Sequence, residues 1–158
     1  MKDLLKLLEK NARLSAAELA AMLDKSEAEI ASQLEKLEKT GVIKGYTTVI
    51  NWEKVGADHV TALIELGVSP KKDSGFDEIA QEIAEFEEVE SVKLMSGGFD
   101  LAVSVRGATF QDIAMFVAKK LSTIDAVLST STLFELRVYK DNGVYITEEE
   151  IDLRGMTL

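Results

Sequence analysis

The stretch MSGGFD, Met95–Asp100, contains the residues best suited to hold a small ligand. Gly97 and Gly98 can adopt positive φ and leave their backbone amides unshielded, and Asp100 can receive a ligand's amino group. Exposed amides suit a carboxylate, so the stretch could bind a zwitterionic amino acid. From spacing alone, a hairpin turn in which Asp100 fixes its own backbone is an equally good interpretation.

Acidic side chains are abundant, but they do not form the pattern of an active site. They gather in runs such as Glu85–Glu90 and Glu148–Glu150, with no base, nucleophile or phosphate-cradling loop arranged around them. The chain has no cysteine, and the single histidine, His59, has no second histidine with which to hold a metal. We therefore expect a protein that is not an enzyme and needs no cofactor.

The composition is that of a globular, soluble chain. Its 158 residues are 46% apolar and 29% charged. No stretch approaches the roughly 20 apolar residues needed to cross a bilayer, and the N-terminus MKDLLKLLEKNARLS mixes charges into its leucines instead of forming a signal-peptide core. We expect a cytoplasmic protein without a membrane partner.

The net charge of −10 is unevenly distributed along the chain. Residues 1–57 hold nine Lys/Arg and nine Asp/Glu, whereas residues 58–158 hold nine Lys/Arg and nineteen Asp/Glu. Phosphate affinity comes mainly from Lys and Arg side chains that displace counterions. A nucleic-acid contact therefore belongs to the first part, and we expect two domains, 1–57 and 58–158.

The first 40 residues predict three short helices. Leucines at helical spacing indicate the first, and two capping boxes, Ser15 with Glu18 and Ser26 with Glu29, open the second and third. The third helix should run over 27–39, with Gly41 as its left-handed terminator. The next segment, 42–52, is rich in β-branched and aromatic residues and predicts an extended wing or hinge strand.

The second part predicts alternating strands and helices in the order βαββαβ. Strands are expected at 60–68, 89–95, 101–105 and 127–139, and helices at 76–85 and 110–122. Such a unit folds as a four-stranded antiparallel sheet with both helices on one face, the ferredoxin-like arrangement of the α+β class. The other sheet face needs a cover, for which we expect a second copy and apolar strand residues at Val60, Ala62, Ile64, Val103, Val105, Leu133 and Val138.

Three helices, an extended segment and a βαββαβ domain resemble the Lrp/AsnC (feast/famine) transcription regulators over nearly the whole chain. The similarity extends to four motifs, LLEKNARLSAAELAAML, LEKTGVIKGYTTVIN, GGFD and VLSTSTLFEL. It implies an N-terminal winged helix-turn-helix that binds DNA and a C-terminal effector domain that dimerises, often with assembly of dimers into larger rings.

The resemblance also implies an effector pocket between subunits. In the family, the GGFD turn and small hydroxyl residues of the last strand line it. The corresponding strand residues here are Ser129, Thr130, Ser131 and Thr132, of which alternation sends only one set into a given pocket. The expected effector-binding residues are Gly97, Gly98, Asp100, Thr130 and Thr132.

The third helix should present a nearly neutral surface to DNA. Ile30, Leu34 and Leu37 share one face and must pack inward, which turns Glu29, Ser32, Glu35, Lys36 and Lys39 outward. We expect Glu29 to serve the capping box and Glu35 to pair with Lys39. Many family members place an arginine where this chain has Gln33, so the helix is less basic than usual. The expected DNA-binding residues are Lys25, Ser26, Ser32, Gln33, Lys36, Lys39, Lys44 and Tyr46.

Together these features predict a sequence-specific transcription regulator. It should bind DNA as a dimer or a larger homo-oligomer and sense a small molecule, with amino acids as the candidate effectors. The alternative is an effector-binding or hetero-oligomerising partner of other family members, whose own DNA contact is weak or lost.

Overall fold

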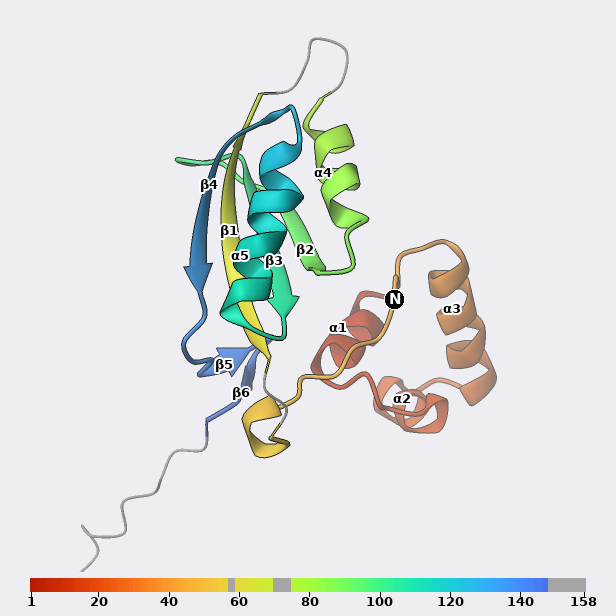
Figure 1. Cartoon of the computed structure of the whole chain (residues 1–158). Coiled ribbons are helices and arrows are strands. Elements are labelled where there is room, and N and C mark those ends of the chain that lie inside the picture. Colours follow the sequence, from red (N-terminus) through yellow and green to blue (C-terminus); the bar gives the residue numbers. More distant parts are fainter. Residues whose placement is uncertain (57–58, 70–74, 148–158) are drawn as a thin grey trace, which may run out of the picture. The chain divides into compact units, whose positions relative to one another are not determined.

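The computed structural model describes residues 1–56, 59–69 and 75–147 (Figure 1). The chain divides into two units, Met1–Val49 and Ile50–Leu158. The domain boundary expected at residue 57 lies a few residues beyond this division. The acidic run Glu148–Glu150 lies outside the described residues.

The first unit contains the three expected helices, α1 (Lys2–Lys10), α2 (Ala16–Leu23) and α3 (Glu27–Lys39). Both capping boxes are present, at Ser15 and Ser26. The helices enclose a small core of buried aliphatic side chains, made of Leu4, Leu8, Leu19, Ala20, Ile30 and Leu37. The periodicity of the sequence therefore predicted the inward face of each helix.

Two residues with positive φ set the directions of α3 and of the chain that follows it. Asp24, between α2 and α3, has a φ of 52°, and Gly41, after α3, has a φ of 69°. After Gly41 the amide of Val42 donates to the carbonyl of Leu37 at 2.9 Å and closes the helix end. The strand expected over 42–52 is absent, because no described segment pairs with it, and a short 3-10 helix, Trp52–Lys54, follows.

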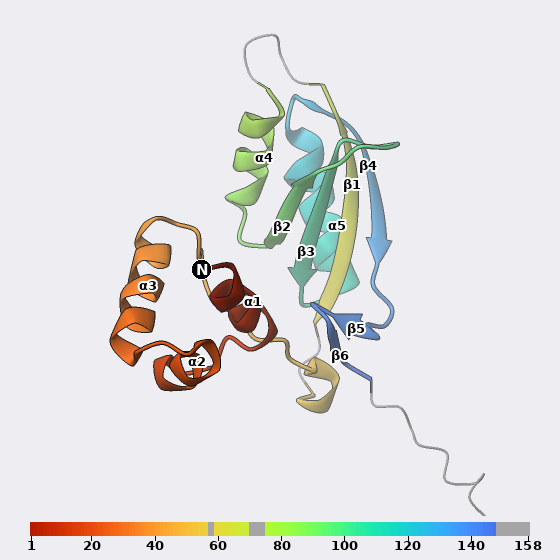
Figure 2. The same cartoon turned by 180° about the vertical axis from the view of Figure 1, so that it is seen from behind.

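The second unit has the expected βαββαβ order. Its elements are β1 (Val60–Val68), α4 (Phe76–Ala84), β2 (Val89–Leu94), β3 (Leu101–Gly107), α5 (Phe110–Lys119) and β4 (Val127–Phe134). The strands form one antiparallel sheet in the order β2-β3-β1-β4. Helices α4 and α5 lie on one face of it (Figures 1 and 2). This is the predicted ferredoxin-like arrangement.

The C-terminal end of this unit differs from the expectation. Strand β4 ends at Phe134 rather than at residue 139, and two short strands follow, β5 (Lys140–Asp141) and β6 (Val144–Tyr145). Asn142 and Gly143 connect them with φ values of 44° and 82°. Two positive φ values in a two-residue loop are typical of a tight hairpin, which explains the Asn-Gly pair.

The strand residues expected on the uncovered face lie mostly on the other one. Ala62 pairs with Val105 and Ile64 with Val103, and all four are fully buried in the core beneath the helices. Of the expected set, Leu133 lies on the open face, opposite Leu63. The prediction that these residues lie on the open face was therefore wrong. Alternation along a strand divides its residues between two faces, but it does not tell which face the helices cover.

The open face consists mainly of small and polar side chains. Register places on it Thr61, Leu63, Glu65, Gly67, Ser91, Lys93, Ala102, Ser104, Arg106, Ser129, Ser131 and Leu133. Leu63 and Leu133 are its aliphatic pair, and Leu133 is 47% exposed. This surface is flat and only partly apolar.

Replacing Ile64 by Ala tests the assignment of the buried face. The side chain is fully buried among α4, α5 and the sheet, so its truncation should lower the free energy of unfolding by about 2–5 kcal/mol. Leu128→Ala is the matched control, since Leu128 is 71% exposed on β4. Urea unfolding measures both variants, and equal losses would contradict the assignment.

Candidate nucleic-acid interface and ligand-binding turn

Ser26 and Glu29 form hydrogen bonds to each other at the start of α3. The Ser26 amide donates to Glu29 Oε2 at 3.0 Å, and the Glu29 amide donates to Ser26 Oγ at 3.3 Å. The bonds from the Ser26 backbone and hydroxyl, with Lys25 nearby, hold the pKa of Glu29 below its ordinary value. Lys25 Nζ lies 3.8 Å from Glu29 Oε1. Glu29 therefore acts as a cap, as expected, and partly neutralises Lys25.

The outward face of α3 is polar and nearly neutral. Lys39 donates to Glu35 at 2.5 Å, which confirms the expected pair, and both side chains are well exposed. Ser32 and Lys36 are exposed, and Gln33 is half-buried. In the part of the chain that the structure describes, Lys36 and Lys44 form no ion pair. Lys36 and Lys44 are therefore free to contact DNA phosphates, whereas Lys25 and Lys39 lie beside carboxylates.

Tyr46 contacts α3 through a hydrogen bond to Glu38. Its hydroxyl donates to Glu38 Oε1 at 2.8 Å, and its ring is 52% exposed. The bond to Glu38, with smaller contributions from burial and from the carboxylate's charge, raises the pKa of the phenol. Glu38 was not predicted as a partner of Tyr46, because a contact between a helix and the segment after it has no periodic signal in the sequence.

This contact predicts a measurable change in the ionisation of Tyr46. Ionising the phenol would place an anion beside the Glu38 carboxylate, so Glu38→Gln should lower the pKa of Tyr46. Ultraviolet titration of tyrosinate measures it, and subtraction of the Tyr46→Phe curve isolates the Tyr46 signal. An unchanged titration in Glu38→Gln would contradict the contact.

Asp100 ties the turn before β3 to the end of β1. Its Oδ2 accepts the Val68 amide at 2.8 Å, and its own amide donates to the Leu66 carbonyl at 2.9 Å. The Met95 amide donates to the Asp100 carbonyl at 2.8 Å and closes the turn. Asp100 therefore has a structural role, although its bond runs to the neighbouring strand and not only into its own turn.

The two glycines of the turn are exposed, and neither adopts positive φ. A Cβ added at Gly97 or Gly98 would meet nothing within 4 Å. The positive φ that glycine permits is therefore not used at either position. What they provide is a backbone whose amides no side chain covers.

The register of β4 separates its hydroxyl residues into two sets. Thr130 pairs with Leu66 and Thr132 with Ile64, so both lie on the helix-covered side at the sheet edge. Ser129 and Ser131 lie on the open face. Asp100 also bonds to Leu66, so Leu66 lies between the turn on one side and Thr130 on the other. Two strand spacings separate the turn from Thr130, which corresponds to about 10 Å.

Two negative observations apply to the described residues 1–56, 59–69 and 75–147. No group of three or more His, Cys, Asp or Glu side chains there could hold a metal ion. None of the helices in the same ranges is both long enough and apolar enough to span a bilayer.

A helix-turn-helix unit joined to an α+β domain with an exposed glycine turn defines a two-domain DNA-binding regulator. Comparison with known families agrees: residues 1–44 match the winged helix-turn-helix DNA-binding model, and residues 61–145 match the Lrp/AsnC ligand binding domain. The chain belongs to the Lrp/AsnC family of transcriptional regulators and is not an enzyme.

Relatives and solved structures match over most of the chain. The uncharacterized HTH-type transcriptional regulator YugG of Bacillus subtilis is 44% identical over 153 residues, which cover 96% of this chain and 92% of YugG. The structure of Escherichia coli AsnC, 26% identical, covers 85% of this chain and 89% of its own, with a TM-score of 0.64. Neisseria meningitidis NMB0573, solved as a complex with L-Met, shares the fold at 23% identity, with a TM-score of 0.70 and coverage of 89% and 90%.

Proposed function

We propose that this regulator acts in the cytoplasm, binds specific DNA sites through α3 as a dimer or larger homo-oligomer, and responds to an amino acid. The observation that carries the DNA contact is the polarity of α3. Ile30 and Leu37 are buried, whereas Ser32, Lys36 and Lys39 are exposed on the opposite side. A capped helix with one buried and one polar exposed face can enter the major groove.

The proposed contacts divide by chemistry. Lys36 and Lys44 neutralise phosphates, and the amides at the α3 N-terminus behind Ser26 favour a further phosphate. Ser32 and Gln33 reach base edges, because hydroxyl and amide groups suit direct readout. Lys25, Lys39 and Tyr46 lie beside these contacts, and their carboxylate partners limit what they add to phosphate binding. The whole proposed set is Lys25, Ser26, Ser32, Gln33, Lys36, Lys39, Lys44 and Tyr46.

Selection of bound sequences from random DNA tests this interface. The wild type should enrich one sequence with two half-sites about one helical turn apart. Lys36→Ala should weaken binding to that sequence by about tenfold to a hundredfold in low salt, because each subunit loses one phosphate contact. Lys140→Ala is the control, since Lys140 is exposed on β5 in the other unit.

If no sequence is enriched and Glu35→Gln does not restore binding, the alternative of a partner protein with lost DNA contact is correct. One observation favours that alternative, namely that Lys25 and Lys39 are both held by carboxylates.

Homo-oligomerisation is proposed from the open face of the sheet. It presents Leu63 and Leu133 among small serine, threonine, alanine and glycine residues, which allow close approach of a second sheet, and Glu65, Lys93 and Arg106 are its charged residues. Light scattering at micromolar concentration should show at least a dimer. A stable monomer would exclude this arrangement.

The effector is proposed to bind at the turn 95–100 and the adjoining end of β4. The amides of Gly97 and Gly98 can donate to a ligand carboxylate, and Asp100 has a carboxylate oxygen besides the one that accepts the Val68 amide. Thr130 and Thr132 supply hydroxyl groups nearby. The L-Met complex of NMB0573 supports an amino acid as the ligand class.

Two substitutions separate ligand binding from turn stability. Asp100→Asn keeps an oxygen that can accept the Val68 amide but removes the charge that an ammonium group needs, so it should fold normally and lose amino-acid binding. Asp100→Ala removes both and should also loosen the turn. Calorimetry across the standard amino acids measures binding, and full binding by Asp100→Asn would exclude Asp100 as the ammonium partner.

A further inference from the structure

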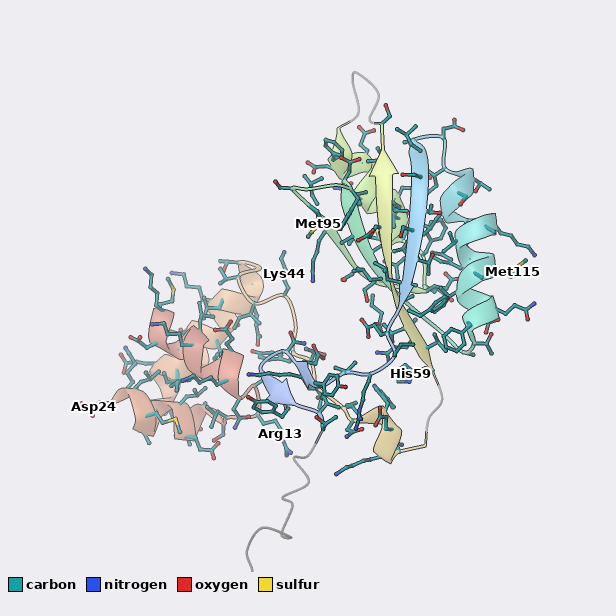
Figure 3. The ribbon with its side chains drawn as sticks, turned by 90° about the vertical axis from the view of Figure 1, so that its left-hand side faces the viewer. Arg13, Asp24, Lys44, His59, Met95 and Met115 are labelled. Carbon is teal, nitrogen blue, oxygen red and sulfur yellow. The ribbon has the colours of Figure 1, made fainter. Side chains whose placement is uncertain are left out.

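A cavity lies at the end of β3 that is opposite to the effector turn. It has a volume of about 260 Å³ and lies between α5 and the end of β3, with Val105, Ile113 and Phe116 as its buried apolar lining. Asp100 precedes β3 and Gly107 ends it, so about 20 Å of strand separates the two places. Figure 3 labels a methionine near each, Met95 in the turn and Met115 on α5, on opposite sides of the sheet.

The charged side chains around this cavity leave one cation without a partner. Lys120 bonds to Glu88 Oε1 at 2.5 Å, and Arg106 bonds to Glu90 Oε1 at 2.8 Å. Asp112 accepts the Thr109 hydroxyl at 2.7 Å in the first turn of α5. The ammonium group of Lys119 has no ion pair or hydrogen bond with any described residue.

Lys119 and Lys120 line the cavity at the C-terminal end of α5, where Lys120 pairs with Glu88, and Asp112 lines it at the first turn of the helix. The two lysines are seven and eight residues after Asp112, which corresponds to about 10 Å along the helix. Lys120 also lies over two aromatic rings, 5.4 Å from the Phe86 centroid and 5.6 Å from that of Phe116. This holds one ammonium group at the apolar lining, next to the unpaired Lys119.

We propose that this cavity binds a small apolar monocarboxylate. The carboxylate contacts Lys119 and the free donors of Lys120, and the hydrocarbon part packs on Val105, Ile113 and Phe116. The volume suits a branched acid of about six carbons, below the size of drug-like ligands. An unpaired cation above a buried apolar surface is complementary to such an amphipathic anion.

Methyl NMR of the full-length protein locates the binding directly. With methionine methyl groups labelled with carbon-13, addition of 4-methylpentanoate should shift the Met115 signal, since Met115 lines the cavity, and leave Met95 unchanged. Met115→Leu assigns the signal. A shift of Met95 alone, or of neither methyl, would overturn the proposal.

Matched ligands and variants test the chemistry by calorimetry. The isosteric 4-methylpentanamide should bind about tenfold or more weakly, because it is neutral and forms no ion pair with the lysines, and acetate should give no heat, because it lacks the apolar part. Lys119→Gln should weaken 4-methylpentanoate by about tenfold, whereas Lys93→Gln and Asp100→Asn should not. Equal affinity for acid and amide, or loss of binding in Asp100→Asn but not in Lys119→Gln, would overturn the proposal.

Lys119 is the better position to substitute than Lys120. Glu88 Oε2 is buried and has no hydrogen-bond partner among the described residues, so removing Lys120 would leave the whole carboxylate without a cation. Lys119→Gln leaves the Lys120–Glu88 pair intact, so a change in affinity measures the contact between Lys119 and the ligand.

Discussion

The pairing of lysines with carboxylates on α3 is the constraint on which the DNA-binding arrangement depends. Glu29 is required by the capping box and lies near Lys25, and Glu35 holds Lys39. Each first unit therefore presents few cations that can displace counterions, and its own phosphate affinity is low. Two units on one assembly make the second contact intramolecular, which can raise affinity by about 10² without any new contact. In the proposed function, assembly through the second unit compensates for the small number of free cations on the first.

The second unit is suited to that role by the division of its sheet into two faces. One face is fully covered by α4 and α5, with Ile64, Val103 and Val105 at its centre. The other carries small residues, three charged side chains and an aliphatic pair, Leu63 and Leu133. The Asp100 bond to Val68 fixes the turn against the sheet, so its amides are already positioned before a ligand arrives. In the proposed function, assembly uses the open face, and ligand binding uses the turn 95–100 and the adjoining end of β4.

The sequence predicted best what local signals determine. Ser15 with Glu18 and Ser26 with Glu29 located two helix starts, and alternation of strand and helix patterns identified the βαββαβ order. Which sheet face the helices cover is decided by packing between distant segments, so the face assigned to Ile64 and Val103 was wrong. The Tyr46–Glu38 and Asp100–Val68 bonds depend on tertiary contacts in the same way. The hairpin at Asn142–Gly143 had a local signal that the sequence analysis did not use.

The salt dependence of operator affinity tests the central claim that carboxylates limit the phosphate contacts of α3. If only Lys36 and Lys44 neutralise phosphates, a dimer makes about four such contacts, and log K should fall against log salt with a slope of about −4. Glu35→Gln frees Lys39 in each subunit and should steepen the slope to between about −5 and −6. A wild-type slope near −7 that Glu35→Gln leaves unchanged would show that all four lysines already contact DNA, and would contradict the claim.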